Sequence, residues 1–183
     1  MGISFEVKVE DLYAVPGNGK AEIVNGEIIE MPPTGGVSGR SGGKIYRSLD
    51  DYEQATKSGY AFPDNVGFIV NLPHRKSFSP DAAFFTGELR GGDFLEGAPV
   101  FAVEVRSKND YGATAEREIT RKRADYFACG TLVFWDVDVL REKLVRVYRA
   151  DASDTPRIYR KGDIAEAEPA LPGWSLAVDL FIP

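Results

Sequence analysis

One apolar segment in the middle of the chain constrains the fold more than any other feature. Residues 99–105 read PVFAVEV, and Glu104 is the one charged residue in this run. Runs of this kind are typical of strands that are buried on both faces of a sheet. A carboxylate in such a strand is costly unless it is paired, protonated or bound to a metal ion. The chain is therefore predicted to form a covered sheet in which Glu104 has a compensating partner.

The segments around this strand indicate an α/β fold. The Asn25-Gly26 dipeptide between two β-rich runs predicts an N-terminal hairpin. The glycine-rich residues 32–44 are expected to form a flexible turn. Helices are expected at residues 9–15, from the flexible turn to about Lys57, and at residues 113–129 before a C-cap at Gly130. Other strands are expected at residues 65–70, 79–85, 131–138, 143–149, 157–163 and 174–182.

Length and composition limit the class of protein. The 183 residues are 43% apolar and 27% charged, which matches a single globular domain spanning residues 1–183. One cysteine, Cys129, and one histidine, His74, provide neither an internal disulfide nor a zinc cluster. Because no signal-like or membrane-length apolar run is present, a cytoplasmic protein without membrane contact is expected. The net charge of −6 argues against indiscriminate nucleic-acid binding, although it leaves room for a local basic cleft and bound divalent cations.

A second carboxylate stands at the start of another core strand. Asp81 follows Pro80 in SPDAAFF, and proline is tolerated at the first residue of a strand. If the strands that carry Asp81 and Glu104 are neighbours, the two carboxylates meet at one edge of the sheet and offer oxygen ligands to Mg²⁺ or Mn²⁺. The alternative is that each carboxylate pairs with a nearby arginine or caps a turn. Adjacency of the two strands decides between these interpretations.

A lysine occupies the inward-facing side of the second predicted helix. A rotation of 100° per residue places five residues on one narrow stripe: Ala115, Ile119, Lys122, Tyr126 and Cys129. Lys122 stands in the middle of this stripe and is predicted to direct its ammonium group toward the acidic site, where it would stabilise developing phosphorane charge. The alternative is that the lysine side chain runs along the helix to reach solvent.

Two further sets of charged residues are candidates for the site or for its substrate. The predicted hairpin contains three glutamates, Glu22, Glu27 and Glu30. Strand alternation places one of them where it adds a ligand to the acidic site, and the alternative for each is a position facing solvent. Three basic residues recur at helical spacing and form a stripe suited to a phosphate backbone: Arg40, Lys44 and Arg47. A solvated helix face is the alternative for this stripe.

Other catalytic motifs are excluded. His74 has no partner nearby in the sequence and follows Pro73 in a polar segment, so it is expected to be a loop residue. Ser107 lacks the G-x-S-x-G setting of a serine hydrolase, and neither G-x-x-x-x-G-K-[ST] nor G-x-G-x-x-G occurs in the chain. The sequence therefore favours metal-assisted chemistry over nucleophilic catalysis or nucleotide binding.

Taken in order, six segments of the chain resemble the Uma family of restriction endonucleases in the PD-(D/E)XK nuclease superfamily. They are EIVNGEIIEMPP, SPDAAFF, VFAVEVRSKND, KRADYFACG, LVFWDVD and ALPGWSLAVDLF, and they cover nearly the whole chain. The most specific elements are Pro80-Asp81, Glu104-Val105-x-Ser107, Lys122-x3-Tyr126-x3-Gly130 and Pro172-Gly173. The resemblance implies a mixed β-sheet flanked by helices and magnesium-dependent hydrolysis of phosphodiester bonds, with DNA as the substrate.

The same resemblance implies a role for five residues. Asp81 and Glu104 become metal ligands, and the carbonyl of Val105 becomes a third ligand. Glu22 becomes an accessory acid, and Lys122 takes the role of the catalytic lysine.

Two positions depart from the pattern of the superfamily. The catalytic lysine usually stands two residues after the second acid, where this chain has Arg106. Relatives often carry a histidine after the MPP turn, where this chain has Ser38 or a neighbouring glycine. Two alternatives therefore stay open. One is a catalytically silent module that assembles as a homodimer through aromatic residues such as Trp135 or Phe181, and the other is a hydrolase of small phosphate substrates with a closed pocket.

Overall fold

A six-stranded mixed sheet forms the centre of the molecule. The computed structural model describes residues 7–183. The strand order in this sheet is β11-β10-β9-β8-β6-β3, and only β8 and β9 run parallel to each other. The bounds are β3 Tyr60–Pro63, β6 Ala82–Phe85, β8 Phe101–Val105, β9 Val133–Asp138, β10 Leu144–Arg149 and β11 Ala152–Arg160.

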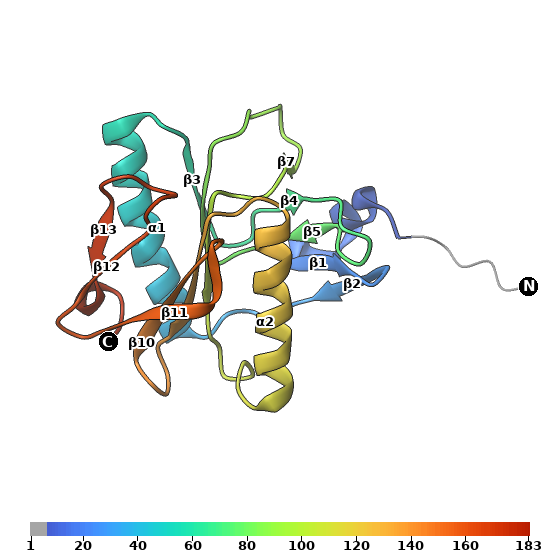
Figure 1. Ribbon diagram of the computed structural model, residues 1–183. Helices are drawn as coiled ribbons and strands as arrows, with labels where there is room; N and C mark the ends of the chain where they lie inside the picture. Colours follow the sequence, from blue (N-terminus) through green and yellow to red (C-terminus); the bar gives the residue numbers. More distant parts are fainter. Residues whose placement is uncertain (1–6) are drawn as a thin grey trace, which may run out of the picture.

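Two helices cover opposite faces of this sheet. They are α1, Gly36–Thr56, and α2, Ala113–Ala128. Figure 1 shows the sheet nearly edge-on between them, with α1 on its left and α2 on its right. Alternation along β6 divides its side chains, since Phe84 packs in the α1 layer with Leu49 while Phe85 packs in the α2 layer with Tyr126. The sheet is therefore buried on both faces, as its apolar strands predict.

Three smaller sheets surround the central one. The N-terminal hairpin and a three-stranded sheet lie on the α2 side, and a hairpin near the C-terminus lies on the α1 side (Figure 1). The strands are β1 Ala21–Val24, β2 Glu27–Glu30, β4 Phe68–Ile69, β5 Ser77–Phe78, β7 Leu95–Glu96, β12 Ile164–Glu166 and β13 Ser175–Ala177. Three short 3₁₀ helices complete the described chain: η1 Val9–Ala14, η2 Pro16–Asn18 and η3 Val178–Leu180.

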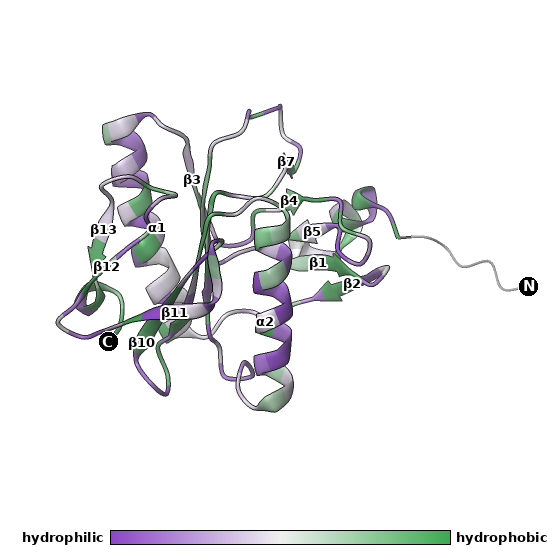
Figure 2. Cartoon of the chain, viewed as in Figure 1, coloured by the Kyte–Doolittle hydropathy of each residue, from purple (hydrophilic) through white to green (hydrophobic). Residues whose placement is uncertain are grey.

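Hydropathy follows this layered arrangement. Figure 2 shows hydrophobic segments concentrated in the strands between the two helices, whereas much of the outer surface of α2 is hydrophilic. Within residues 7–183, no helix combines the length and the apolar character that a bilayer span requires.

The predicted elements are largely confirmed, with corrections at several segments. The hairpin is present, and its turn residues Asn25 and Gly26 both have positive φ angles, of 54° and 77°. The prediction that residues 65–70 belong to the core sheet is wrong, because only Phe68–Ile69 is a strand and it pairs with β5 and β7 outside that sheet. The strand expected at residues 174–182 is limited to Ser175–Ala177, and β3 was not predicted.

The predicted flexible turn at residues 32–44 is also wrong, because α1 begins at Gly36. Small residues of its first two turns are buried, including Ser38, Ser41 and Gly42. A Cβ at Gly42 would lie 3.5 Å from the Asp81 carbonyl oxygen and 3.9 Å from Val105 Cγ2. These are ordinary van der Waals distances, so the start of α1 is in contact with the strands that carry the two acids, and the burial of its small residues outweighs the low helix propensity of its glycines.

We expect opposite effects from adding a methyl group at two glycines near α1. A Cβ at Gly59 would lie 2.5 Å from the Phe85 carbonyl oxygen, so Gly59→Ala should destabilise the protein by about 1–3 kcal/mol. At Gly43, inside α1, a Cβ meets no atom within 4 Å, so Gly43→Ala should stabilise it by about 0.5–1 kcal/mol. Urea unfolding of both variants measures the two values. Equal effects would contradict this account of the packing.

Candidate active site

The pairing of β6 with β8 brings Asp81 and Glu104 together. The strands are antiparallel and place Ala82 opposite Val103, so the start of β6 meets the end of β8. The backbone N–H of Asp81 donates to the Val103 carbonyl at 3.0 Å, and the N–H of Val105 donates to Asp81 Oδ2 at 2.7 Å. Glu104 points to the side of the sheet that α2 covers, whereas Asp81, which directly precedes β6, lies at the end of the strand pair and also borders α1. The strands whose adjacency the sequence left open are therefore neighbours.

Two side chains of α2 reach Glu104. Lys122 Nζ lies 2.7 Å from Glu104 Oε1, and the Tyr126 hydroxyl donates to the same oxygen at 2.9 Å. The Tyr126 ring is fully buried and stacks on Phe78 at a centroid distance of 3.9 Å. Because the two residues are four apart, they occupy one side of the helix. The predicted stripe of α2 therefore supplies both partners of the buried carboxylate.

The N-terminal hairpin contributes a third acid. Glu22 Oε1 lies 2.8 Å from Lys122 Nζ and accepts the backbone N–H of Ser79 at 2.9 Å. Its side chain is only 4% exposed, whereas Glu27 and Glu30 are exposed to solvent. Of the three glutamates in the hairpin, Glu22 is thus the one that the structure brings to Lys122.

A buried arginine holds Glu22 and belongs to a network that the sequence did not indicate. Arg75 Nη1 lies 2.6 Å from Glu22 Oε2, and Arg75 Nε lies 2.8 Å from Asp125 Oδ2 on α2. His74 Nε2 lies 2.7 Å from the other oxygen of Asp125, although the imidazole itself is half exposed. His74 lies in the loop between β4 and β5, as predicted, and its partner Asp125 is 51 residues away in the chain. No local pattern marks Arg75, because its partners are about 50 residues away in the chain.

A second lysine, which the sequence analysis also missed, contacts the other acid. Lys20 Nζ lies 2.6 Å from Asp81 Oδ1 and 2.7 Å from Asp64 Oδ1. The Lys20 side chain is 12% exposed, and that of Asp64 is 43% exposed. Lys20 precedes β1 and Asp64 follows β3, so two loops that are distant in sequence meet at Asp81.

Burial and charge together shift the titration of the cluster. For Glu104, burial is the largest influence, and with the charges of Asp81 and Glu22 it outweighs Lys122 and Lys20 and raises the pKa to about 7. Burial opposes the ionisation of Glu22, but Lys122 and Arg75 outweigh it and lower the pKa of Glu22. Burial also opposes the charge on Lys122, yet Glu104 and Glu22 raise the pKa of Lys122. The cluster thus holds a charged lysine between two acids of different proton affinity.

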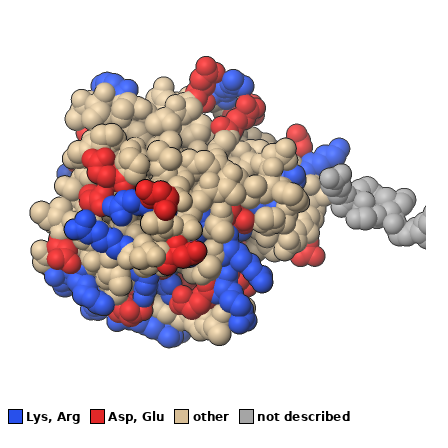
Figure 3. Space-filling view, viewed as in Figure 1, with Lys and Arg blue, Asp and Glu red and all other residues tan. Residues whose placement is uncertain are grey.

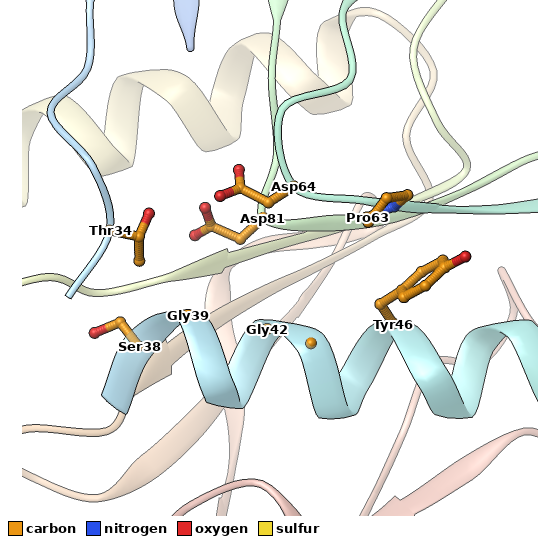
Figure 4. Close-up of a pocket in the computed structure, with 9 residues that line it drawn as sticks. Thr34, Ser38, Gly39, Gly42, Tyr46, Pro63, Asp64 and Asp81 are labelled. Atoms are coloured by element: carbon orange, nitrogen blue, oxygen red, sulfur yellow. The ribbon is translucent and has the colours of Figure 1, made fainter. Parts of the chain in front are cut away.

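A small hollow lies beside Asp81. It has a volume of about 120 Å³ and is lined by Thr34, Ser38, Gly39, Gly42, Gly43, Tyr46, Pro63, Asp64 and Asp81. Figure 4 shows the carboxylates of Asp64 and Asp81 side by side above α1, on the side where Thr34 and Ser38 also lie. Ser38 is buried, and its hydroxyl donates to the Arg106 carbonyl at 2.9 Å. Ser38 therefore connects the start of α1 to the end of β8.

Arg106 does not take the place of the catalytic lysine. Its guanidinium is 3% exposed and forms a two-pronged pair with Asp136, with both N–O distances at 2.7 Å, and it also pairs with Glu116. These pairs direct it to β9 and the start of α2. Arg106 is thus part of a buried ion-pair network beside the site.

Several other predicted residues lie away from the acids. Arg40, Lys44 and Arg47 are exposed on α1, and Lys44 Nζ contacts the Leu180 carbonyl near the C-terminus. Trp135 and Phe181 are 0% and 3% exposed and stack on each other with a centroid distance of 5.9 Å. The suggestion that these two aromatic residues form a dimer surface is therefore wrong, because they belong to the core.

The chemistry of the two acids fits a hard divalent cation. Mg²⁺ requires only one or two carboxylates, because it keeps several water ligands. Asp81 and Glu104 supply two carboxylates on neighbouring strands, and the carbonyl of Val105 belongs to the same strand end. Within residues 7–183, no group of three or more Asp, Glu, His or Cys side chains that could hold a metal ion is found.

The mixed sheet, its two covering helices and the hairpin define a restriction-endonuclease-like protein. The fold is also seen in the crystal structure of a "putative nuclease belonging to DUF820" from Anabaena variabilis. The two chains share 18% identity, with a TM-score of 0.74 over 96% of this chain and 97% of the other.

A model of the Uma2 family, described as "Putative restriction endonuclease", matches residues 9–179. The chain belongs to this family, as the resemblance of its motifs predicts. No match is found among curated proteins. Family and fold together place the chain among restriction-endonuclease-like nucleases.

We expect Arg75→Met to be strongly destabilising, because it leaves Glu22 and Asp125 as buried carboxylates without their shared partner. The free energy of unfolding should fall by about 3–5 kcal/mol. The matched control is Arg90→Met, which breaks exposed pairs with Glu88 and Glu96 and should cost less than about 1 kcal/mol. Urea denaturation measures the free energy of unfolding of both variants. Similar losses in the two variants would contradict a special role for Arg75.

The raised pKa of Glu104 predicts a characteristic pH dependence of stability. Between its ordinary value of 4.5 and about 7, native Glu104 keeps a proton that the unfolded chain has released. Its contribution is therefore fully present below pH 4.5 and lost as the pH rises to about 7, a change on the order of 3 kcal/mol. Urea unfolding of the wild type and Glu104→Gln between pH 5 and 8 isolates this change. The same pH dependence in both proteins would show that Glu104 does not titrate in this range.

Proposed function

We propose that the protein is a metal-dependent endonuclease that hydrolyses phosphodiester bonds in DNA, with Mg²⁺ or Mn²⁺ as its cofactor. The observation that carries this proposal is the convergence of Asp81, Glu104 and Lys122 from three separate elements at one end of the β6–β8 pair. Glu22 is a fourth charged group of this site, and it contacts Lys122. The match to the Uma2 family, described as "Putative restriction endonuclease", supports phosphodiester hydrolysis as the reaction.

In this proposal, Asp81, Glu104 and the carbonyl of Val105 hold the metal ion. When bound, the ion polarises the scissile phosphate and lowers the pKa of an attacking water molecule. Lys122 is kept charged by Glu104 and Glu22, so its ammonium stabilises the negative charge that develops on the phosphorane. Tyr126 and Lys122 both contact Oε1 of Glu104 and thereby orient this carboxylate. Glu22 fixes the position of Lys122 as an accessory acid.

The surface offers basic side chains for contact with a DNA backbone. Arg40, Lys44 and Arg47 lie exposed on α1 and are proposed to contact phosphates away from the cleaved bond. Figure 3 shows basic side chains interspersed with acidic ones and more abundant over the lower half of the view.

Two alternatives are less well supported. A hydrolase of small phosphate substrates needs a closed pocket, but the hollow beside Asp81 is about 120 Å³, below the roughly 300–1,000 Å³ of ordinary small-molecule sites. A silent binding module has no need of a buried lysine between two carboxylates, which is costly to desolvate. The complete set of charged groups thus favours an active nuclease.

The test is plasmid nicking with Mg²⁺ or Mn²⁺ and with a chelator. Asp81→Asn, Glu104→Gln and Lys122→Met should each lose on the order of 100-fold or more in rate while they remain folded by circular dichroism. The control Glu27→Gln removes an exposed acid from the same hairpin and should keep wild-type activity. A folded wild type that neither binds metal by calorimetry nor nicks DNA would reject the endonuclease and favour the silent module.

A further inference from the structure

Each of the two acids has one oxygen that the scaffold holds in place. Asp81 Oδ2 accepts the backbone N–H of Val105, and Glu104 Oε1 accepts from Tyr126 and contacts Lys122. In the part of the chain from residue 7 onward, no hydrogen bond reaches Oε2 of Glu104. The second oxygen of Asp81, Oδ1, contacts Lys20 at 2.6 Å. A cation that bridges the two acids through their second oxygens therefore has to compete with the Lys20 ammonium.

Lys20 is held between two carboxylates and not by Asp81 alone. Its Nζ lies 2.7 Å from Asp64 Oδ1, so the ammonium keeps a partner when the contact to Asp81 is broken. Asp64 is nearly half exposed and lines the hollow together with Asp81, and Figure 4 shows the two carboxylates side by side. The charge of Lys20 also acts on Glu104, so all three acids lie within its electrostatic reach.

We propose that Lys20 is the counter-ion of the metal position. In the metal-free protein its ammonium group contacts both Asp81 and Asp64, and when a divalent ion binds the ammonium is transferred wholly to Asp64. This inference rests on the proposed function, because it takes Asp81 and Glu104 as metal ligands. Lys20 and Asp64 are thus positioning residues, and neither contacts the substrate.

Electrostatics explains what the pairing of Lys20 with Asp64 contributes to the site. Without a cation, Asp81 and Glu104 are two partly buried carboxylates on neighbouring strands, 13% and 14% exposed, and they repel each other. Lys20 compensates this repulsion in the metal-free state. A divalent ion at Asp81 repels the ammonium, and the flexible lysine side chain with its three donors can move to Asp64. Asp64 therefore lowers the cost of displacing Lys20.

The experiment is calorimetric titration of Mn²⁺ into three variants of the full chain. Lys20→Met removes the competitor and should tighten binding on the order of tenfold. Asp64→Asn removes the receiving carboxylate and should weaken binding about threefold to tenfold. In the double variant, Asp64→Asn should change the affinity of Lys20→Met by less than about twofold, because Asp64 acts only through Lys20.

Two controls make the result specific. Lys161→Met removes the same charge from an exposed lysine after β11 and should leave the Mn²⁺ affinity unchanged. Thermal unfolding without metal should show a lower Tm for Lys20→Met than for wild type, and saturating Mn²⁺ should remove this difference. If Lys20→Met fails to fold, the weaker binding of the surface variant Asp64→Asn still tests the transfer.

Each contrary outcome has a distinct meaning. Unchanged or weaker Mn²⁺ binding by folded Lys20→Met would overturn the counter-ion role. A loss of affinity from Asp64→Asn that persists in the double variant would show that Asp64 acts on the ion directly, and the transfer would be wrong. Failure of the proposed function is separate, since Mn²⁺ would then not bind to wild type or would bind equally to Glu104→Gln. Glu104-dependent binding without tightening by Lys20→Met rejects only this inference.

Discussion

The antiparallel pairing of β6 with β8 is the constraint on which the rest of the site depends. It sets the start of one strand beside the end of the other, so that Asp81 and Glu104 lie near each other at one end of the strand pair. Two carboxylates in this position repel each other and lose hydration. Their neighbours must therefore supply positive charge, and two lysines do so, one from α2 and one from the segment before β1.

The charges around the acids form one connected network. Lys122 joins Glu104 to Glu22, and Arg75 joins Glu22 to Asp125 on the same helix as Lys122. The network thus links the hairpin, the β4–β5 loop, the central sheet and α2. A buried pair of this kind adds little net stability compared with apolar packing, but losing one partner is expensive. Its value lies in holding the lysine and the acids in one arrangement.

Local sequence patterns predicted those helices, strands and turns whose conformation depends mainly on their own residues. The Asn25-Gly26 turn, the stripe of α2 and the apolar run of β8 were recognisable without tertiary information. The start of α1 was not, because its glycines and serines favour a turn locally, whereas in the structure they form a helix whose buried side lies against Asp81 and Val105. Lys20 and Arg75 also gave no signal, since their partners lie up to 61 residues away.

The sequence by itself determined that a carboxylate is buried in a core strand, that Lys122 faces inward from a helix and that a hairpin precedes them. These properties follow from the periods of strand and helix, which the side-chain pattern encodes directly. Only the tertiary structure decided that β6 and β8 are neighbours, that Glu22 and no other hairpin glutamate reaches Lys122, and that Lys20 occupies Asp81. The physical reason is that a periodic pattern specifies which face a residue takes, whereas strand order and long-range ion pairs depend on how all elements pack together.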